Sequence, residues 1–393
     1  MSTQQLNFSI EEYNSRIDKT RRAMQVRDIG LLVVTDPSNM AWLTGYDGWS
    51  FYVHQCVVLG LEGEPLWFGR GQDAQGAYRT VFMSDENVVG YPDNYVQSTE
   101  RHPMQYLAKI LLDRNIVSER IGVELDNYYF SASCYINLKQ SLPQVEIVDA
   151  TALVNWQRAI KSDLEIKYMQ NAARIVEKMH SYIIETVKPG MRKNELVAGI
   201  YKTGITGLEG IGGDYPAIVP LLPSGADAAA PHLTWDDQPI SNNQGTFFEI
   251  SGCYKRYHCP LSRTIYFGKP PQEFLNAEQA QLEGIEAALD MARPGNTCEQ
   301  VEQAWREVIA SHGMEKESRI GYSIGLSYPP DWGERTMSLR PGDKTVLKPG
   351  MTFHLIPALW MNDWGLETTE SFRVTENAAQ TFCDYPRRLF VVD

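Results

Sequence analysis

Short apolar runs alternate with amphipathic stretches over about the first 150 residues. Four of the runs are bounded by turn residues, as buried strands are: 29–35, 51–61, 120–124 and 145–148. Between them, apolar positions recur at helical spacing over 11–26 and 104–114. This alternation of strand-like and helix-like pattern predicts a small α/β domain.

A different pattern follows this first region. The sequence SDLE at 162–165 is a capping box, and apolar residues then recur at helical spacing until the Pro-Gly pair at 189–190. About a hundred residues later, a second predicted helix ends at another Pro-Gly pair, at 294–295. Each of these helices is followed by a further helical stretch, at 196–201 and 301–309. The second region is therefore predicted to contain two similar α/β halves, related by a pseudo-twofold repeat.

The length of 393 residues favours two domains over one core, and we place their boundary at 160/161, giving domains 1–160 and 161–393. A net charge of −13 argues against nucleic acid or an anionic membrane as a partner, because both require a basic surface. No run approaches 18 apolar residues, and the N-terminal stretch lacks the pattern of a signal peptide. The six scattered cysteines are expected to be buried free thiols. Together these features predict a cytoplasmic protein.

Several motifs carry a resemblance to a known family. They are SG…PH at 224–232, Arg-Thr at 263–264, PGMTF at 349–353 and DPSNMAWLTGYDGW at 36–49. They resemble the pita-bread family of creatinases, prolidases and methionine aminopeptidases. The resemblance implies an α/β (α+β) protein, with a creatinase-like N-terminal domain followed by a pita-bread catalytic domain.

The metal-dependent members of this family hold two metal ions with two aspartates, one histidine and two glutamates. The matching positions in this sequence hold Glu249, Pro260, Tyr322, Ile356 and either Glu370 or Glu367. Proline and isoleucine have no ligand atom, and tyrosine is a poor substitute for imidazole. We therefore expect no metal ion and no other cofactor at this site.

Glu249 is the residue on which the predicted chemistry centres. It lies in the strand-like run TFFEIS, where alternation places it on the same face as Phe247. A carboxylate in so apolar a run is costly unless it is paired or functional. Ion pairing with Arg263 or Lys255 is the structural alternative.

Three further positions are candidate catalytic residues. His232 matches the catalytic histidine of creatinase and is suited to proton transfer near neutral pH, although a structural histidine is the simpler interpretation. Tyr322 could donate a hydrogen bond, and Glu370 or Glu367 could supply a second carboxylate. The sequence GYSIG at 321–325 also fits the nucleophile elbow of serine hydrolases, but Pro329 and Pro330 block the helix that an elbow requires, so Ser323 is not expected to be catalytic.

Longer runs, such as 212–237 and 327–343, are similar to a metal-free branch of this family that hydrolyses cyclic amidines. The resemblance implies a small cationic ring with a carboxylate as substrate, a homodimer in which one chain covers the other chain's site, and a deacetylase that acts on the product. Arg335 is a candidate for binding the substrate carboxylate, and the alternative is an ion pair with Glu334. His354 could bind substrate or belong to the core. A metal-dependent X-Pro peptidase and a non-catalytic binding protein are the rival functions. The expected substrate-binding residues are Trp49, Tyr52, His54, His258, Arg335, His354, Trp360 and Glu367.

Overall fold

The computed structural model describes residues 6–392, which divide into two compact units between Arg158 and Ala159. The division lies two residues before the predicted boundary at 160/161. Residues 1–5, which begin the stretch tested for a signal-peptide pattern, lie outside the described part of the chain. Within the described part, no helix combines the length and the apolar character needed to cross a membrane.

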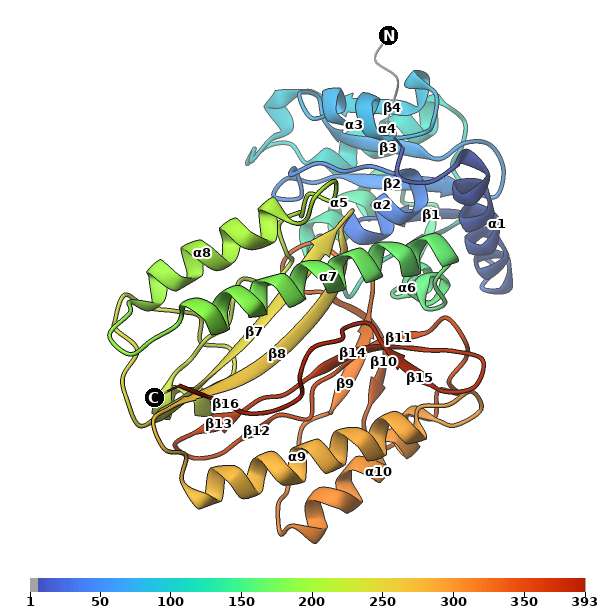
Figure 1. Ribbon diagram of the computed structural model, residues 1–393. Helices are drawn as coiled ribbons and strands as arrows, with labels where there is room; N and C mark the ends of the chain where they lie inside the picture. The colour runs from blue at the N-terminus through green and yellow to red at the C-terminus, as the bar shows by residue number, and fades with distance from the viewer. Residues whose placement is uncertain (1–5, 393) are drawn as a thin grey trace. The chain divides into compact units, whose positions relative to one another are not determined.

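The first unit is built on a six-stranded mixed sheet (Figure 1). Its strand order is β4-β3-β2-β1-β5-β6, in which β1 pairs antiparallel with β2 and parallel with β5. The strands are β1 (Leu31–Val34), β2 (Cys56–Gly60), β3 (Leu66–Arg70), β4 (Val88–Tyr91), β5 (Arg120–Val123) and β6 (Glu146–Asp149). Three of the four predicted strands agree closely with β1, β5 and β6. The run 51–61 begins five residues too early, because Ser50–Gln55 form turns and loop before β2.

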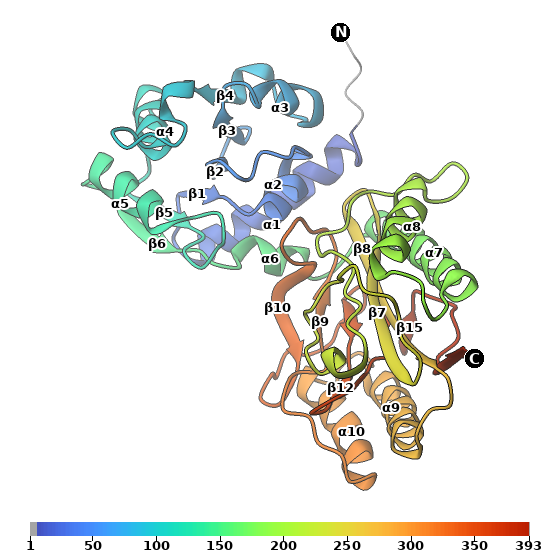
Figure 2. The ribbon, with the colours of Figure 1, turned by 90° about the vertical axis from the view of Figure 1, so that its left-hand side faces the viewer.

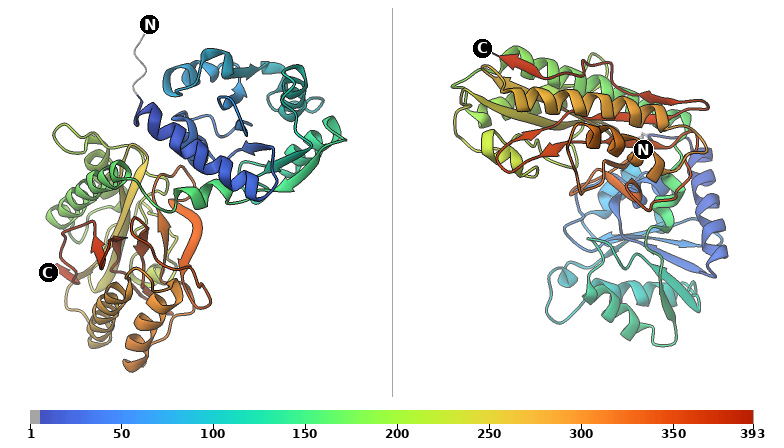
Figure 3. Two further views of the ribbon diagram at one scale, coloured as in Figure 1. Left: turned by 90° about the vertical axis from the view of Figure 1, so that its right-hand side faces the viewer. Right: turned by 90° about the horizontal axis from the view of Figure 1, so that it is seen from below.

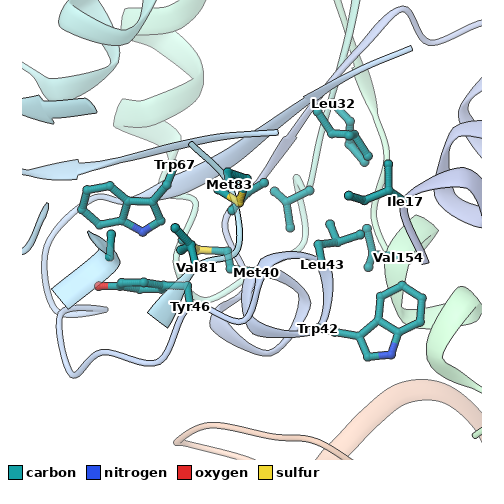
Figure 4. Close-up of a cluster of buried hydrophobic side chains, with 14 of the residues drawn as sticks. Ile17, Leu32, Met40, Trp42, Leu43, Tyr46, Trp67, Val81, Met83 and Val154 are labelled. Carbon is teal, nitrogen blue, oxygen red and sulfur yellow. The ribbon is translucent and has the colours of Figure 1, made fainter. Parts of the chain in front are cut away.

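Helices cover both faces of this sheet, as Figure 2 shows. One face carries α1 (Ile10–Val26), α2 (Pro37–Thr44), α3 (Ala74–Thr80) and α6 (Leu153–Arg158). Their apolar side chains form the cluster of Figure 4, in which Met40, Leu43 and Trp67 are buried. The other face carries α4 (Pro103–Asp113) and α5 (Ala132–Ser141), together with a second core. Short 3-10 segments, η1 (Asp85–Asn87) and η2 (Asp93–Tyr95), flank β4.

The second unit contains two helix pairs, each followed by strands, as the internal repeat predicted. The first half consists of α7 (Asp163–Thr186), α8 (Lys193–Thr206), η3 (Gly225–Ala229), β7 (Gln244–Tyr254) and β8 (Tyr257–Phe267). The second half begins with α9 (Gln272–Met291) and α10 (Cys298–Ser311), which lie side by side (Figure 3). Its strands are β9 (Gly321–Ile324), β10 (Gly333–Leu339), β11 (Thr352–Leu355), β12 (Leu359–Trp360), β13 (Gly365–Leu366), β14 (Glu370–Val374), β15 (Ala379–Thr381) and β16 (Phe390–Val392).

These strands form three sheets, with orders β16-β8-β7, β10-β9-β11-β14-β15 and β12-β13. The fold therefore confirms the predicted α/β class. The capping box that begins α7 is also present, because the Ser162 amide donates to Glu165 at 2.8 Å and the Glu165 amide donates to the Ser162 hydroxyl. All six cysteines are buried free thiols, as expected.

One face of β7 packs directly on α7. A Cβ atom at Gly252 would lie 2.0 Å from the backbone oxygen of Ala172 in α7, so this position requires glycine. Side chains alternate along a strand, and Glu249 is three residues earlier, so it points to the opposite face. That face is covered by other parts of the second unit, since β13 contacts β7 and both β11 and β14 contact β8. Glu249 is therefore directed into the interior of the second unit.

Candidate active site

Glu249 lies in the middle of β7, directly opposite Ser262 of β8. Paired residues on antiparallel strands share a face, so Ser262 lies beside the Glu249 carboxyl. Only 4% of Glu249 is exposed. Neither of the two predicted ion pairs is present in the described residues: Arg263 binds another glutamate, and Lys255 is not paired with Glu249. A structural ion pair therefore does not account for this buried carboxyl.

Glu367, in the loop between β13 and β14, supplies a second carboxyl next to Glu249. Burial and the adjacent Glu367 raise the pKa of Glu249 well above its usual value. Burial also raises the pKa of Glu367, to about 7, against the opposing effects of Ser262, Lys316 and Trp360. Two carboxyls this close resist simultaneous ionisation, so near neutral pH they share a proton between them.

Buried polar side chains surround this pair. The Ser262 hydroxyl and the Trp360 indole lower the pKa of Glu367 by hydrogen bonding to it, and the nearby Lys316 lowers it by its charge. Buried polar atoms are costly unless they have partners. Their concentration around one pair of carboxyls is typical of a site that receives a polar ligand.

Tyr322 is fixed beside Glu249 by a chain of hydrogen bonds. Its hydroxyl accepts from the Trp332 indole at 2.8 Å and bonds to Nδ1 of His354 at 3.2 Å. The other ring nitrogen of His354 bonds to the Thr369 hydroxyl at 3.0 Å. Burial, and then the neighbouring Glu249, raise the pKa of Tyr322, so that it keeps its proton. Tyr322 is therefore held in one orientation by Trp332 and His354. Burial lowers the pKa of His354 to about 3, so this histidine is neutral.

Lys316 and Asp331 complete the site, and neither was predicted from the sequence. Lys316 donates to the Ala358 carbonyl at 2.7 Å and lies 3.7 Å from the ring centre of Trp360. Burial lowers the pKa of Lys316 to about 7, while Glu367 opposes that shift. Burial raises the pKa of Asp331, and this carboxylate contributes to the raised pKa of Glu249. Both residues lie in loops. No sequence motif marks Lys316, and the only sequence feature that marks Asp331 is the surrounding run PPDW.

Glu370 does not join the pair, which corrects one of the two alternatives for the second carboxylate. Its carboxyl binds Arg263 at 2.7 Å and approaches Arg387 at 3.5 Å. Arg263 also donates to the carbonyls of Thr369 and Pro386. Glu370 is therefore part of a buried ion pair that connects β8 to the C-terminal segment, and Glu367 is the carboxylate beside Glu249.

The remaining predicted residues of the second unit are placed in three different ways. His258 donates from Nδ1 to the Arg256 carbonyl and accepts at Nε2 from the Ala217 amide. No ring nitrogen remains to bind a substrate, which corrects the expected binding role of His258. His232 is exposed in the loop that follows η3. Arg335 is exposed at a backbone φ of 55° in an irregular part of β10.

Two alternatives for these residues are also resolved. Glu334, the surface partner considered for Arg335, is instead buried and binds Lys161 at 2.6 Å. Ser323 lies within β9, hydrogen-bonded to Thr336, and the element that follows it is the strand β10, so GYSIG is not a nucleophile elbow.

Trp49 and Tyr52 are exposed in the first unit, and His54 follows them in the sequence just before β2. Their predicted contribution to a partner chain's site stays a prediction.

The residues around Glu249 do not fit a two-metal centre. Pro260 lies within β8, Ile356 follows β11, and Tyr322 is engaged by Trp332 and His354. Among residues 6–392, no group of three histidine, cysteine, aspartate or glutamate ligands within coordinating reach includes Glu249. The ammonium of Lys316 beside Glu367 also opposes a metal cation. The site presents two carboxylates and hydrogen-bond donors in place of a metal cage.

This fold and carboxylate pair define a two-domain enzyme of the creatinase and prolidase type. Residues 16–160 match the creatinase/prolidase N-terminal domain, and residues 167–376 match metallopeptidase family M24. The chain belongs to family M24, and like its relatives it is a hydrolase.

Relatives match over nearly the whole chain. An ectoine hydrolase of Halomonas elongata is 58% identical over 98% of each chain, and an uncharacterized hydrolase/peptidase of Sinorhizobium fredii is 43% identical over 99% of each. Among solved structures, the prolidase of Thermococcus sibiricus superposes with a TM-score of 0.84 at 20% identity, covering 98% of this chain and 100% of that one. The last comparison supports the fold alone.

Proposed function

We propose that this enzyme hydrolyses ectoine, and by extension its hydroxylated derivative, to an N-acetyl-2,4-diaminobutyrate. The observation that carries the proposal is the buried pair of adjacent carboxyls, Glu249 and Glu367, whose pKa values are both raised by burial. The relative named ectoine hydrolase, with its 58% identity over 98% of the chain, supports the choice of substrate.

The charge of the substrate complements this pair. Ectoine is a cyclic amidine whose positive charge is delocalised over two ring nitrogens, and it also carries a carboxylate. A cation placed beside Glu249 and Glu367 favours their ionised forms, so that binding drives proton release from the pair. Trp360 and Trp332 provide aromatic surroundings suited to a delocalised cation. The ring carbon is already electrophilic, so a Lewis acid has little to add.

The pair provides both proton transfers of the hydrolysis. An ionised carboxylate removes one proton from water as the oxygen bonds to the amidinium carbon, and the resulting carboxylic acid delivers that proton to the departing ring nitrogen. As the carbon–nitrogen bond breaks, the new hydroxyl loses its proton and becomes the amide carbonyl, and this second proton leaves with the amine as an ammonium ion. Glu249 can serve as the base toward water or, equally, as the nucleophile toward the ring carbon. Tyr322 donates to charge that develops near the reacting carbon.

Other residues complete the proposed cycle. His232, exposed on its loop, exchanges the proton of the leaving nitrogen with solvent, and Arg335 binds the substrate carboxylate. A homodimer would bring Trp49 and Tyr52 of one chain to the site of the other, and we propose that assembly together with a cytoplasmic location. A deacetylase is the enzyme class that would act on the acetylated product.

The proposed reaction proceeds without a metal ion, and turnover of ectoine by chelator-treated enzyme tests it. Chromatography should show complete conversion to the acetylated diamine, with no loss of rate after dialysis against EDTA. Loss of activity to chelator, together with cleavage of X-Pro dipeptides, would establish the metallopeptidase alternative instead. Ectoine binding without product would establish a non-catalytic binding protein.

A further inference from the structure

The first unit contains a group of potential metal ligands that the proposed reaction does not use. His54, His102 and Cys134 place one ligand atom each within 4.8 Å of one another. The Cys134 sulfur lies 3.3 Å from Nδ1 of His54, and the two imidazole rings are 4.6 Å apart between centres. Ligand atoms of a tetrahedral zinc ion with bond lengths of roughly 2.0–2.3 Å lie roughly 3.3–3.8 Å apart. The Cys134 sulfur and Nδ1 of His54 already have this separation, and a small rotation of the His102 ring would complete the coordination sphere.

Each of the three residues is held on an anchored part of the backbone. The His54 carbonyl accepts a hydrogen bond from the Tyr91 hydroxyl at 2.9 Å. His102 is the N-cap of α4, and Cys134 lies in the first turn of α5, where its amide donates to the Ser131 side chain. A site on anchored elements loses little conformational entropy when it binds an ion. The geometry is thus preorganised and does not depend on a mobile loop.

One nitrogen of this group lacks a partner among the described residues. Nε2 of His102 is buried without a hydrogen bond to any of residues 6–392, although Nδ1 of the same ring accepts from the Met104 amide at 3.2 Å. Leaving a buried polar nitrogen unsatisfied is unfavourable. The Cys134 thiol is also buried, at the edge of the core formed by α4 and α5. An ion bound between the three side chains would give this nitrogen a partner and would replace the contact between the Cys134 sulfur and His54.

We propose that His54, His102 and Cys134 form a binding site for a divalent ion of the zinc class, with solvent as the fourth ligand. Two imidazoles and one thiolate favour zinc or cobalt, and a group without a carboxylate disfavours magnesium and calcium. Binding replaces the thiol proton of Cys134, which is released to solvent. The half-buried rings of His54 and His102 provide access from outside.

Metal binding at this site is coupled to the start of α4. Coordination through Nε2 of His102 requires the ring proton to move to Nδ1, where it opposes the Met104 amide. The N-cap hydrogen bond of α4 is then lost while the ion is bound. The site also engages His54, so that a metal-loaded chain cannot use Nδ1 of His54 to bind a substrate.

Cobalt titration of the full-length protein tests the proposal, because a thiolate ligand to Co²⁺ gives an intense near-ultraviolet charge-transfer band. The wild type should bind one Co²⁺ per chain with this band, and Zn²⁺ should displace it. Cys134→Ala should abolish the band and weaken binding at least tenfold. His102→Asn should also weaken binding, and it retains a side chain suited to the N-cap. Hydrogen exchange at the Met104 amide should accelerate when metal is added.

Two control variants test whether the bound metal lies at this site. Cys56→Ala removes a neighbouring buried thiol outside the group and should leave the band unchanged. The double variant Glu249→Gln/Glu367→Gln should also retain the metal. The proposal is overturned if wild type and Cys134→Ala bind Co²⁺ equally, or if Cys56→Ala loses the band. Metal that disappears only with Glu249 and Glu367 would instead contradict the metal-free reaction proposed above.

Discussion

Glu249 and Glu367 lie side by side in the interior of the second unit, and Glu367 raises the pKa of Glu249. If the pair provides the acid and the base, removing either ionisable group should prevent the reaction. We expect Glu249→Gln and Glu367→Gln each to lower kcat by about 10³-fold, within the usual range for general acid–base groups. Steady-state kinetics and isothermal titration with ectoine would separate the loss of turnover from a loss of binding.

Glu370→Gln is the matched control for these two variants. Glu370 is equally buried, but its carboxyl binds Arg263 and does not face Glu249. Breaking this pair leaves a buried guanidinium without its counter-ion, at a cost of about 3–5 kcal/mol of stability. The expected variant unfolds more readily and has near-normal kcat below its unfolding temperature. If Glu370→Gln had a normal melting temperature but no turnover, Glu370 would be a catalytic residue.

The pair should also produce a distinctive dependence of stability on pH. The pKa of Glu367 rises from 4.5 to about 7 on folding, so between these values the folded state binds a proton that the unfolded state has lost. Stability from this group is fully present below pH 4.5 and is lost as pH rises to about 7. The loss is about 3 kcal/mol, from 1.36 kcal/mol per pKa unit. Urea unfolding across this range should show a steeper loss of stability for the wild type than for Glu367→Gln, in which Glu249 and Glu124 still have pKa values raised by burial.

Tyr322 and Ser323 are adjacent on β9 and offer a direct comparison. Tyr322→Phe removes the hydroxyl that accepts from Trp332 and bonds to His354, whereas Ser323 bonds to Thr336. We expect Tyr322→Phe to lower kcat by about 10²-fold, since loss of one oxyanion donor costs about 10²–10³-fold. Ser323→Ala should retain most activity. An inactive Ser323→Ala variant that folds normally would support the alternative in which Ser323 is a catalytic nucleophile.

His232 tests whether proton exchange with solvent limits the reaction. His232→Gln should lower kcat by about 10²-fold, while the exposed position leaves stability unchanged. Added imidazole should restore part of the rate. Activity equal to that of the wild type would show that Glu249 and Glu367 perform both proton transfers unaided.

Local sequence features predicted the elements that depend on local interactions. The capping box and apolar spacing identified α7 because a helix is stabilised by residues three and four positions apart. The strands β3 and β4 were not predicted, and their short apolar runs become strands by pairing with each other and with β2. The family match likewise identified Glu249, but it did not identify Lys316 and Asp331, which lie around the carboxyl pair.

The second carboxylate shows why the site could not be completed from sequence. Glu367 and Glu370 are three residues apart, so an extended chain directs them to opposite faces. Which face meets Glu249 is decided by distant contacts: Ser262 of β8 pairs with Thr369, and Arg263 binds Glu370. Lys316 reaches Glu367 from a loop about 50 residues away. Such arrangements require the packed fold.

Arg335 allows the roles of a backbone conformation and a side chain to be separated. Its φ of 55° is unfavourable for most residues, but asparagine adopts it readily. Arg335→Asn should therefore preserve β10 while removing the guanidinium. If that group binds the substrate carboxylate, KM for ectoine should rise by about 10–100-fold with little change in kcat, as expected for a charged hydrogen bond of about 1.5–3 kcal/mol.

The comparison with Arg293→Asn, another exposed arginine of the same unit, controls for the loss of positive charge. That variant should leave KM unchanged. Equal effects of the two substitutions would mean that Arg335 acts only through long-range attraction, and the dependence of KM on salt would then be strong for the wild type. A selective effect of Arg335→Asn that persists at high salt would instead identify a direct contact, since a desolvated ion pair is screened far less than one in solvent.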